Sequence, residues 1–474
     1  MTRSFQPVRA NARPLADIDK ASIVHPFTVL ADQAAAGPRI IVSADRITLT
    51  DDAGRHYLDA SSGLWCVNVG YGRVEIAEAM AEEARRLSYG SCFGPYSNEP
   101  LIHLTERLLE LGPRNMTQVF FANSGSEAND TQIKLAWLYN NLRQKPRKKK
   151  IIARHSAYHG TTLGAGSLGG HALLHGGFDL PLAGFLHTEC PDYHRRADAQ
   201  LSPGQYSRAL ADTLDRLIDE EGPDTVAAFV AEPVMGAGGV LVPPEGYFDE
   251  IGRVLAKHDV LLIADEVITG FGRTGHWFAC QGLGFEPDLV TLAKGLTSAY
   301  VPMSACLISE KLARVLTEGS RRAGAFGHGF TTSGHPVAAA AALKNLEIME
   351  REDLVGNAQR TGAYLLERLR AELADHPLVG EVRGLGLMAA VELDANKAER
   401  RPFADASAIG ARLGKLCYEE GLLVRGALGK AAAALAPSLV LDLAEADEIV
   451  RRLSRAVARL ADQLRAEGVW RPDA

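Results

Sequence analysis

The sequence predicts a large α/β domain, with a mostly parallel sheet flanked by helices, and a smaller α+β domain after it. In the middle of the chain, short apolar runs bounded by Gly, Asn or acidic residues alternate with helical patterns. After His335 the pattern changes to an alanine-rich helix, a second helix and short strands. At 474 residues the chain also exceeds one typical domain.

Six apolar runs are candidate strands of the large sheet, namely residues 119–122, 151–154, 226–231, 260–264, 289–292 and 304–308. A helix is expected at 130–142, where Ile133, Ala136 and Trp137 recur at helical spacing. In the smaller domain we expect a helix at about 353–374, a strand at 387–393 and a closing helix near 444–467. We place the domain boundaries so that residues 1–75 form an N-terminal segment joining the small domain, 76–334 the large domain and 335–474 the C-terminal small domain.

Composition and charge exclude several classes of protein. Charged residues make up 23% and hydrophobic residues 46% of the chain, which is ordinary for a globular protein. A formal net charge of −7 offers no basic surface for nucleic acid, and we expect the one basic run, residues 145–150, to be a solvated loop. No segment approaches the roughly 18 apolar residues that span a bilayer, and residues 1–15 lack a secretory signal.

The six cysteines are scattered, with no close pair at metal-ligand spacing and no dense disulfide framework. Reduced thiols suit the cytoplasm, so we expect a cytoplasmic protein. We expect no metal site, no nucleic-acid partner and no membrane partner.

Five polar residues each follow a predicted apolar strand: Asn123, Tyr158, Glu232, Asp265 and Lys294. In a parallel sheet the carboxyl ends of the strands meet at one crevice, where α/β proteins bind their ligands. Five separate segments are therefore expected to converge on one site.

The segment 123–130, Asn-Ser-Gly-Ser-Glu-Ala-Asn-Asp, runs from a strand into a helix. Its small residues let backbone N–H groups approach an anion at the positive helix N-terminus, so Gly125 and Ser126 are candidate phosphate ligands. A turn that only caps the helix is the alternative.

Asp265 and Lys294 carry the strongest chemical signal. A carboxylate at the rim of a core is costly unless it has a partner, which a protonated ring nitrogen would supply; a helix cap and a metal ligand are alternatives, the metal being disfavoured because no His or Cys stands nearby at ligand spacing. Lys294 is either a surface lysine or a buried amine with a depressed pKa. A buried amine at Lys294 is favoured because Asp265 ends the preceding strand, 29 residues upstream (294 − 265).

Together these segments resemble the class III aminotransferases of pyridoxal phosphate (PLP) fold type I. The resemblance runs from about Trp65 to Pro437 and rests on residues 124–129, 158–160, 231–233, 265–275, Lys294 and 330–336. It implies cofactor-binding roles for Gly125, Ser126, Tyr158, Glu232, Asp265, Val267, Lys294 and Thr331.

The resemblance also implies the role of each group. Lys294 would bind the cofactor covalently and act as general acid and base, and Asp265 would keep the ring nitrogen protonated. Val267 and Tyr158 would pack on the two ring faces, and Thr331 would reach the phosphate of a neighbouring subunit. The expected assembly is thus a homodimer or a dimer of dimers.

Within the family, residues 62–69, 231–239, 328–331 and 421–429 are most similar to the omega-transaminases, or amine:pyruvate aminotransferases. That branch implies PLP-dependent transfer of an amino group from a primary amine or an omega-amino acid to pyruvate or a similar small keto acid. Phe27, Trp65 and Phe93 would line an aromatic amine pocket, and Arg425 would bind a carboxylate with its planar fork.

Five features depart from the family pattern: Met235, Ser438, Thr332, Cys92 and an alanine run at 431–434 that we expect to be a featureless loop. Three other functions fit parts of the sequence. A racemase or aminomutase would use the same residues without a second substrate. A nucleotide-binding dehydrogenase would leave Lys294 and Asp265 unexplained, and a non-catalytic binding protein would have no Lys294-linked chromophore.

Overall fold

A computed structural model describes residues 13–471. Its largest sheet has seven strands in the order β4-β10-β9-β8-β7-β5-β6. The strands are β4 (Met116–Ala122), β5 (Lys150–Arg154), β6 (Phe185–Thr188), β7 (Val226–Ala231), β8 (Leu261–Asp265), β9 (Leu289–Leu292) and β10 (Ser304–Ser309). All six predicted strands are confirmed within a few residues, and β6 is a seventh that the sequence did not suggest.

The sheet is mostly parallel, as predicted, because only β10 runs against its neighbours β9 and β4. Strands β8 and β9 are adjacent, with Asp265 opposite Thr291. Lys294 follows β9 by two residues, so it lies at the same sheet edge as Asp265. The register of β8 against β9 thus places the two residues at the same edge of the sheet.

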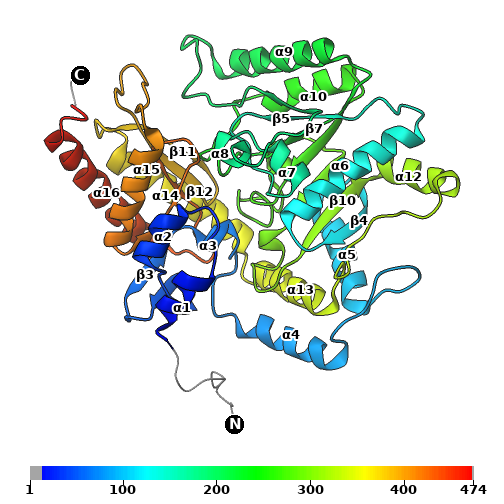
Figure 1. Cartoon of the computed structure of the whole chain (residues 1–474), viewed down its shortest axis with the longest axis horizontal. Coiled ribbons are helices and arrows are strands. Elements are labelled where there is room, and N and C mark those ends of the chain that lie inside the picture. Colours follow the sequence, from blue (N-terminus) through cyan, green and yellow to red (C-terminus); the bar gives the residue numbers. More distant parts are fainter. Residues whose placement is uncertain (1–12, 472–474) are drawn as a thin grey trace.

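Helices cover both faces of this sheet (Figure 1). One face packs against α6 (Gly125–Leu142), α7 (Leu163–Leu168) and α12 (Glu310–Ala323). The other face packs against α5 (Glu99–Leu111), α9 (Pro203–Glu221) and α10 (Tyr247–Lys257). The helix predicted at 130–142 begins at Gly125, because the Ser124 side chain caps it by accepting a hydrogen bond from the Glu127 N–H at 3.2 Å.

Two four-stranded sheets lie beside the large one, in the order β1-β2-β3-β13 and β11-β12-β15-β14. Their strands are β1 (Ile41–Asp45), β2 (Thr48–Asp51), β3 (His56–Asp59), β11 (Val379–Leu385), β12 (Met388–Leu393), β13 (Leu422–Leu423), β14 (Arg425–Gly426) and β15 (Ala432–Leu435). Because β13 pairs with β3, the first sheet joins the two ends of the chain. The expected domain boundaries stay predictions.

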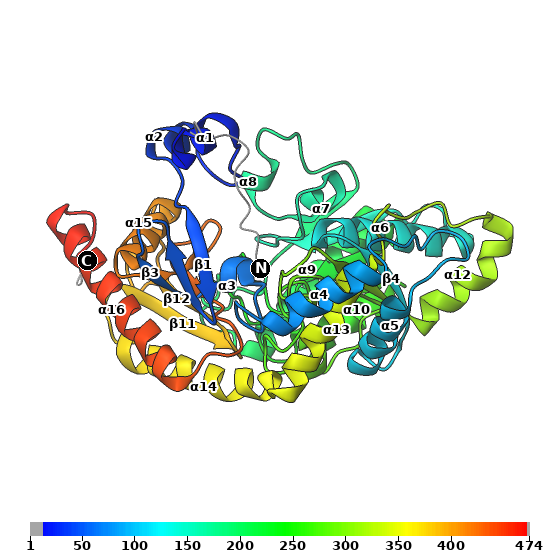
Figure 2. The ribbon, with the colours of Figure 1, turned by 90° about the horizontal axis from the view of Figure 1, so that it is seen from below.

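The remaining helices complete this part of the molecule and connect it to the large sheet. They are α1 (Leu15–Ser22), α2 (Leu30–Ala36), α3 (Ser62–Trp65), α4 (Val74–Arg86), α8 (Ala172–His175), α11 (Ala279–Gly282), α13 (Pro336–Arg351), α14 (Leu354–Leu373), α15 (Ala406–Glu419) and α16 (Leu443–Ala466). Figure 2 shows α1 and α2 projecting from the small sheets, and α16 and α14 running along the opposite side. No helix within residues 13–471 is long and apolar enough to cross a membrane. Residues 1–12, where no secretory signal is expected, lie outside the described part.

One sequence expectation is wrong and another holds only in part. The alanine run at 431–434 is not a featureless loop, because Ala432–Leu435 form the buried strand β15 between β12 and β14. The basic run 145–150 is a loop up to residue 149 and is exposed at 145–147, as expected, but it is not solvated throughout. Lys148 is buried, and its ammonium donates to the carbonyl oxygens of Val226, His258 and Asp259 at 2.9–3.0 Å, partners far away in the sequence.

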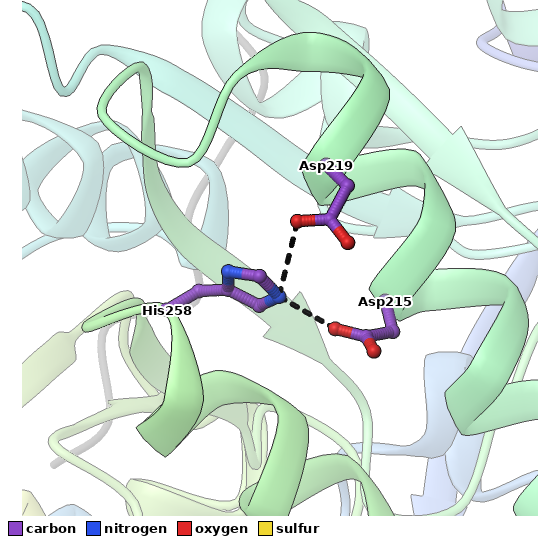
Figure 3. Close-up of side chains that lie close together, drawn as sticks. All are labelled: Asp215, Asp219 and His258. Atoms are coloured by element: carbon purple, nitrogen blue, oxygen red, sulfur yellow. Dashed lines mark hydrogen bonds and ion pairs between the residues drawn. The ribbon is translucent and has the colours of Figure 1, made fainter.

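A group of titratable side chains joins α9 to α10 (Figure 3). His258 Nε2 lies 2.5 Å from Asp215 Oδ1 and 3.8 Å from Asp219 Oδ1, a set that could hold a metal ion. However, Lys257 Nζ already lies 2.8 Å from Asp215 Oδ2. We interpret the group as a polar link between the two helices. His258 lies just before β8, at the opposite end of that strand from Asp265.

We expect Asp215→Asn to lower the free energy of unfolding by about 1 kcal/mol, since a partly exposed charge-assisted pair is lost. The hydrogen bond from Lys257 lowers the pKa of Asp215, so its stabilisation is complete above the ordinary carboxyl pKa and disappears as the pH falls through the lowered value. Unfolding midpoints of the two proteins should therefore differ at pH 7, begin to approach each other below about pH 4, and coincide only below the lowered pKa. Equal midpoints at pH 7 would contradict the polar link.

Candidate active site

The carboxyl ends of β5, β7, β8 and β9 surround a cavity of about 160 Å³. Eleven residues line it, namely Gly125, Ser126, Tyr158, His159, Gly160, Glu232, Asp265, Val267, Ile268, Ala293 and Lys294. Seven of these were predicted as site residues from the sequence. The structure therefore brings the predicted segments together, apart from Asn123, whose side chain instead accepts a hydrogen bond from Thr332 Oγ1 at 2.7 Å.

Lys294 is the residue with the most unusual environment. Burial lowers the pKa of its ammonium, and the Asp265 charge opposes that effect only in part. Within the described chain its Nζ has no hydrogen bond and no ion pair, and its backbone takes the left-handed conformation with φ 47°. Such a backbone costs about 1–2 kcal/mol in a residue with a side chain. A half-buried amine that lacks a partner, has a lowered pKa and is held at a strained backbone position is typical of a reactive lysine.

Three hydrogen bonds fix the orientation of the Asp265 carboxylate. Its Oδ2 accepts hydrogen bonds from Asn129 Nδ2 at 2.8 Å and from His159 Nδ1 at 2.7 Å. Its Oδ1 accepts a third from the Val267 N–H at 3.0 Å. Asn129 is itself fixed, because Thr291 Oγ1 donates to its carbonyl oxygen at 2.8 Å. These contacts leave Asp265 facing the cavity as a carboxylate in a fixed orientation.

The beginning of α6 and the loop after Tyr158 form a tight cradle. A Cβ at Gly125 would lie 3.2 Å from Val267 Cγ2, and a Cβ at Gly160 only 2.4 Å from Ser126 Oγ. Gly160 also has φ 134°, a conformation that favours glycine. The Ser126 Oγ accepts a hydrogen bond from the Thr161 N–H at 3.0 Å. Small residues are therefore required where backbone N–H groups would approach an anion.

Tyr158 and Glu232 form one wall of the cavity. Glu232 Oε1 accepts from the Tyr158 N–H at 3.2 Å, and its Oε2 accepts from the Gly236 N–H at 2.8 Å. Burial raises the pKa of Glu232 and that of the Tyr158 hydroxyl. Glu232 thus fixes the backbone of two loops, while the Tyr158 ring borders the cavity.

Arg425 approaches this cavity from β14 as an exposed cation. It has no hydrogen bond or ion pair to any residue in the range 13–471, yet its charge acts on the groups of the cavity. Burial is the main cause of the raised pKa of Tyr158 and the lowered pKa of Lys294; Arg425 opposes the first and adds to the second. It is therefore available for a carboxylate.

The predicted aromatic residues are spread around the cavity. Trp65 is buried and packs against Gly236 beside Ile268, and Ile268 lines the cavity. Phe27 is exposed, with its ring centroid 6.4 Å from that of Tyr158. Neither residue lines the cavity, so their substrate roles stay predictions.

Phe93 and Thr331 lie away from Lys294 within one chain. Phe93 lines a separate opening of about 970 Å³ beside Phe326 and His328. Thr331 is exposed, and its carbonyl oxygen accepts from the Tyr89 hydroxyl at 2.9 Å. Neither residue lines the cavity around Lys294, so their predicted roles stay predictions.

The sequence reading missed Asn129 and His159 as site residues. Both lie within the recognised motifs, but their contact with Asp265 is side chain to side chain between separate segments. A histidine directly after Tyr158, in the loop that follows β5, was the available signal.

These residues fit PLP. Lys294 offers an unpartnered amine, Asp265 a fixed carboxylate for a ring nitrogen, and Gly125 with Ser126 a helix N-terminus for a phosphate. Val267 and Tyr158 border the space between them. No residue of the set conflicts with a phosphorylated pyridine.

Comparisons with known proteins agree with this geometry. The family model of the class-III aminotransferases matches residues 30–457. A diaminobutyrate–2-oxoglutarate transaminase of Halomonas elongata is 46% identical over 460 residues, covering 96% of this chain and 98% of the relative. A putrescine–pyruvate aminotransferase of Pseudomonas aeruginosa is 41% identical over 445 residues, covering 94% and 96%.

The fold also matches solved structures. An omega transaminase from Pseudomonas jessenii, in complex with PMP, has a TM-score of 0.93 and 42% sequence identity. The match covers 95% of this chain and 99% of that one.

Proposed function

This chain belongs to the class-III aminotransferases, which are PLP-dependent, and from that membership we propose that it moves an amino group from a primary amine or omega-amino acid to pyruvate or a similar small keto acid. The observation that carries the proposal is the half-buried, unpartnered Lys294 facing Asp265, with the unpaired cation Arg425 beside the same cavity. The P. jessenii omega transaminase and the P. aeruginosa putrescine–pyruvate enzyme support it.

Different residues of the cavity would bind different parts of the cofactor. Gly125 and Ser126 would bind its phosphate, Val267 and Tyr158 would enclose the ring, and Asp265 would bind the ring nitrogen. Glu232 would support Tyr158 through the backbone contact described above. When bound, PLP supplies an electron-withdrawing ring that stabilises negative charge at the substrate carbon.

Lys294 would carry the proton in both half-reactions. Burial lowers its pKa and so favours the neutral Nζ, which can accept a proton from the substrate carbon and return it at a neighbouring position. Asp265, held in three hydrogen bonds, would keep a proton on the ring nitrogen.

The cations near the cavity favour a monocarboxylate acceptor. Among the lining residues the only lysine or arginine is Lys294, and Arg425 adds one further charge from outside. One guanidinium can bind one carboxylate bidentately. A dicarboxylate such as 2-oxoglutarate, which the H. elongata relative uses by its name, would need a second cation.

Formation of alanine tests the proposed reaction. The purified holoenzyme would be incubated with 1-phenylethylamine, putrescine or 4-aminobutyrate, each with pyruvate or with 2-oxoglutarate. We expect alanine in proportion to amine consumed, and little glutamate. Conversion of an amine without any keto acid would instead support the racemase or aminomutase.

We expect Arg425→Ala to damage the two half-reactions unequally. Loss of a bidentate, charge-assisted pair of about 1.5–3 kcal/mol should lower the affinity for pyruvate by roughly tenfold to a hundredfold. The reaction with 1-phenylethylamine should change little, because that amine has no carboxylate. Single-turnover spectra of each half-reaction measure this directly, and equal losses in both would make Arg425 a structural residue.

We also propose that the active unit is a homodimer, or a dimer of dimers, in which Thr331 reaches the partner's cofactor phosphate. Thr331 is exposed and lies away from the cavity of its own chain, which supports this assignment. Thr331→Ala should weaken PLP binding, and mixed dimers that carry it in one subunit should lose one tight site of two. Sedimentation of a fully active monomer would contradict the proposal.

A cytoplasmic location stays a prediction, supported by six cysteines that are all free thiols. Disulfides are rare in that compartment.

A further inference from the structure

The position of Arg425 is not set by polar contacts of its own side chain, which has no hydrogen bond or ion pair in the described structure. Strand β14 contributes only two residues to the sheet, with Arg425 opposite Ala434 and Gly426 opposite Ala433. The tip of this hairpin, residues 427–431, extends beyond the paired residues. Another contact must therefore fix where the guanidinium lies.

We propose that Lys430 is a positioning residue for the keto acid, because it clamps the tip of the Arg425 hairpin against loops of the large sheet. The inference rests on the proposed role of Arg425 in binding the acceptor carboxylate. Lys430 itself does not line the cavity.

The ammonium of Lys430 lies in a nearly buried ionic network. Its Nζ is 2.6 Å from Asp192 Oδ2 and 3.3 Å from both oxygens of Glu392. The side chain of Lys430 is only 13% exposed, and that of Glu392 only 2%. The same Glu392 carboxylate contacts Arg195 at 2.7 Å and Arg383 at 2.7 Å. Burial alone would raise the pKa of Glu392. The charges of Arg383, Lys430 and Arg195 outweigh that effect and lower this pKa to about 2.

This network joins parts of the chain that are distant in sequence. Asp192 follows β6 of the large sheet, whereas Glu392 lies on β12 of the small one. Lys430 therefore bridges the two parts from the hairpin itself. Because the charges are buried, their attraction is screened far less than that of a surface pair.

The alkyl chain of Lys430 packs against the loop 236–239, which follows the cavity residue Glu232. A Cβ at Gly239 would lie 2.9 Å from Lys430 Cδ and 3.4 Å from Ala427 Cβ. The Leu428 N–H donates to the Ala237 carbonyl at 2.9 Å. The segment 236–239 is itself held by Glu232, through the Gly236 N–H. Contacts thus run without a gap from the hairpin tip to a residue that lines the cavity.

The consequence is specific for carboxylate binding. Arg425, Gly426 and Gly429 are exposed, so without Lys430 the tip keeps only the Leu428–Ala237 hydrogen bond and the packing of the buried Ala427. A displaced guanidinium would lose its bidentate geometry toward pyruvate. An apolar amine, which makes no such contact, would be unaffected.

The experiment compares Lys430→Met, Lys430→Arg and the control Lys311→Met, which removes an exposed ion pair with Asp288. We expect Lys430→Met to raise the KM for pyruvate by about tenfold, since small misplacements of a positioning group have effects of that order or larger. The single-turnover rate with 1-phenylethylamine should stay within about twofold. Lys430→Arg should restore most of the pyruvate affinity, and Lys311→Met should change neither quantity. Asp192→Asn provides a second variant if Lys430→Met does not fold.

A double variant separates this inference from the role of Arg425. In an Arg425→Ala background, Lys430→Met should lower the affinity for pyruvate no further, because both changes remove the same interaction of Arg425 with the carboxylate. If Arg425→Ala alone leaves pyruvate unaffected, the proposed function is wrong. If Arg425→Ala weakens pyruvate but Lys430→Met does not, or if Lys430→Met slows both half-reactions equally, the clamp is overturned.

Discussion

Replacement of Lys294 by alanine should reduce turnover by at least about 10⁴-fold, because it removes both the covalent anchor and the acid–base group. The fold should be retained. The Lys294 ammonium has no hydrogen bond or ion pair among the described residues, so its loss leaves no buried partner unpaired. The variant should still bind PLP, because the cradle at Gly125 and Ser126 is unchanged, but without covalent attachment.

Lys311→Ala is the matched control, because Lys311 is exposed and only pairs with Asp288 at 2.9 Å. Activity, absorbance spectrum and melting temperature of both variants would be measured together. Residual activity of Lys294→Ala above about 1% of wild type would show that another group carries the proton.

Asp265→Asn should bind PLP yet lose about 10²- to 10³-fold in rate, the usual cost of removing a preorganised electrostatic group. The amide is neutral and cannot stabilise a positive charge on the ring nitrogen as an ion-pair partner. It also has to place its oxygen toward Asn129 and His159, which donate to Oδ2. Its NH₂ group then faces the Val267 N–H, and that hydrogen bond is lost.

The control for this variant is Asp249→Asn, on the exposed surface of α10. Single-turnover rates with 1-phenylethylamine, at saturating PLP, isolate the chemical step from cofactor binding. A rate for Asp265→Asn within about threefold of wild type would mean that the ring nitrogen has another partner.

The residues at the strand ends could be predicted because the information is local. An apolar strand followed by Asp265 or Lys294 places each side chain at the same sheet edge, whatever the rest of the chain does. The register of β8 against β9 then completes the arrangement. The same argument predicted Glu232 correctly, at the end of β7.

Features that depend on partners distant in sequence could not be predicted in this way. Lys148 is buried because carbonyl groups of Val226, His258 and Asp259 surround its ammonium, and nothing in the run 145–150 reveals that. Likewise, alanines have a low intrinsic preference for strands, yet 432–435 form β15 because β12 pairs with them. Tertiary contacts decided both cases.

The position of Trp65 illustrates the same limit within the site. The resemblance implies that Trp65 lines a substrate pocket, and that role stays a prediction. What the sequence does not reveal is that its segment packs against the end of β15, where Ser62 Oγ donates to the Ala436 carbonyl at 2.7 Å. Trp65 is thereby buried beside Met388 and Ala434 in the core. Only the packing of residues some 370 positions apart, from 62 to 436, determines this.

Reductive labelling of the holoenzyme tests the central claim most directly. Sodium borohydride fixes PLP to the lysine that holds it, and proteolysis followed by mass spectrometry identifies the labelled peptide. We expect one label per chain, on Lys294, and no label in Lys294→Ala. A stable label on any other lysine of the wild-type protein would contradict the account.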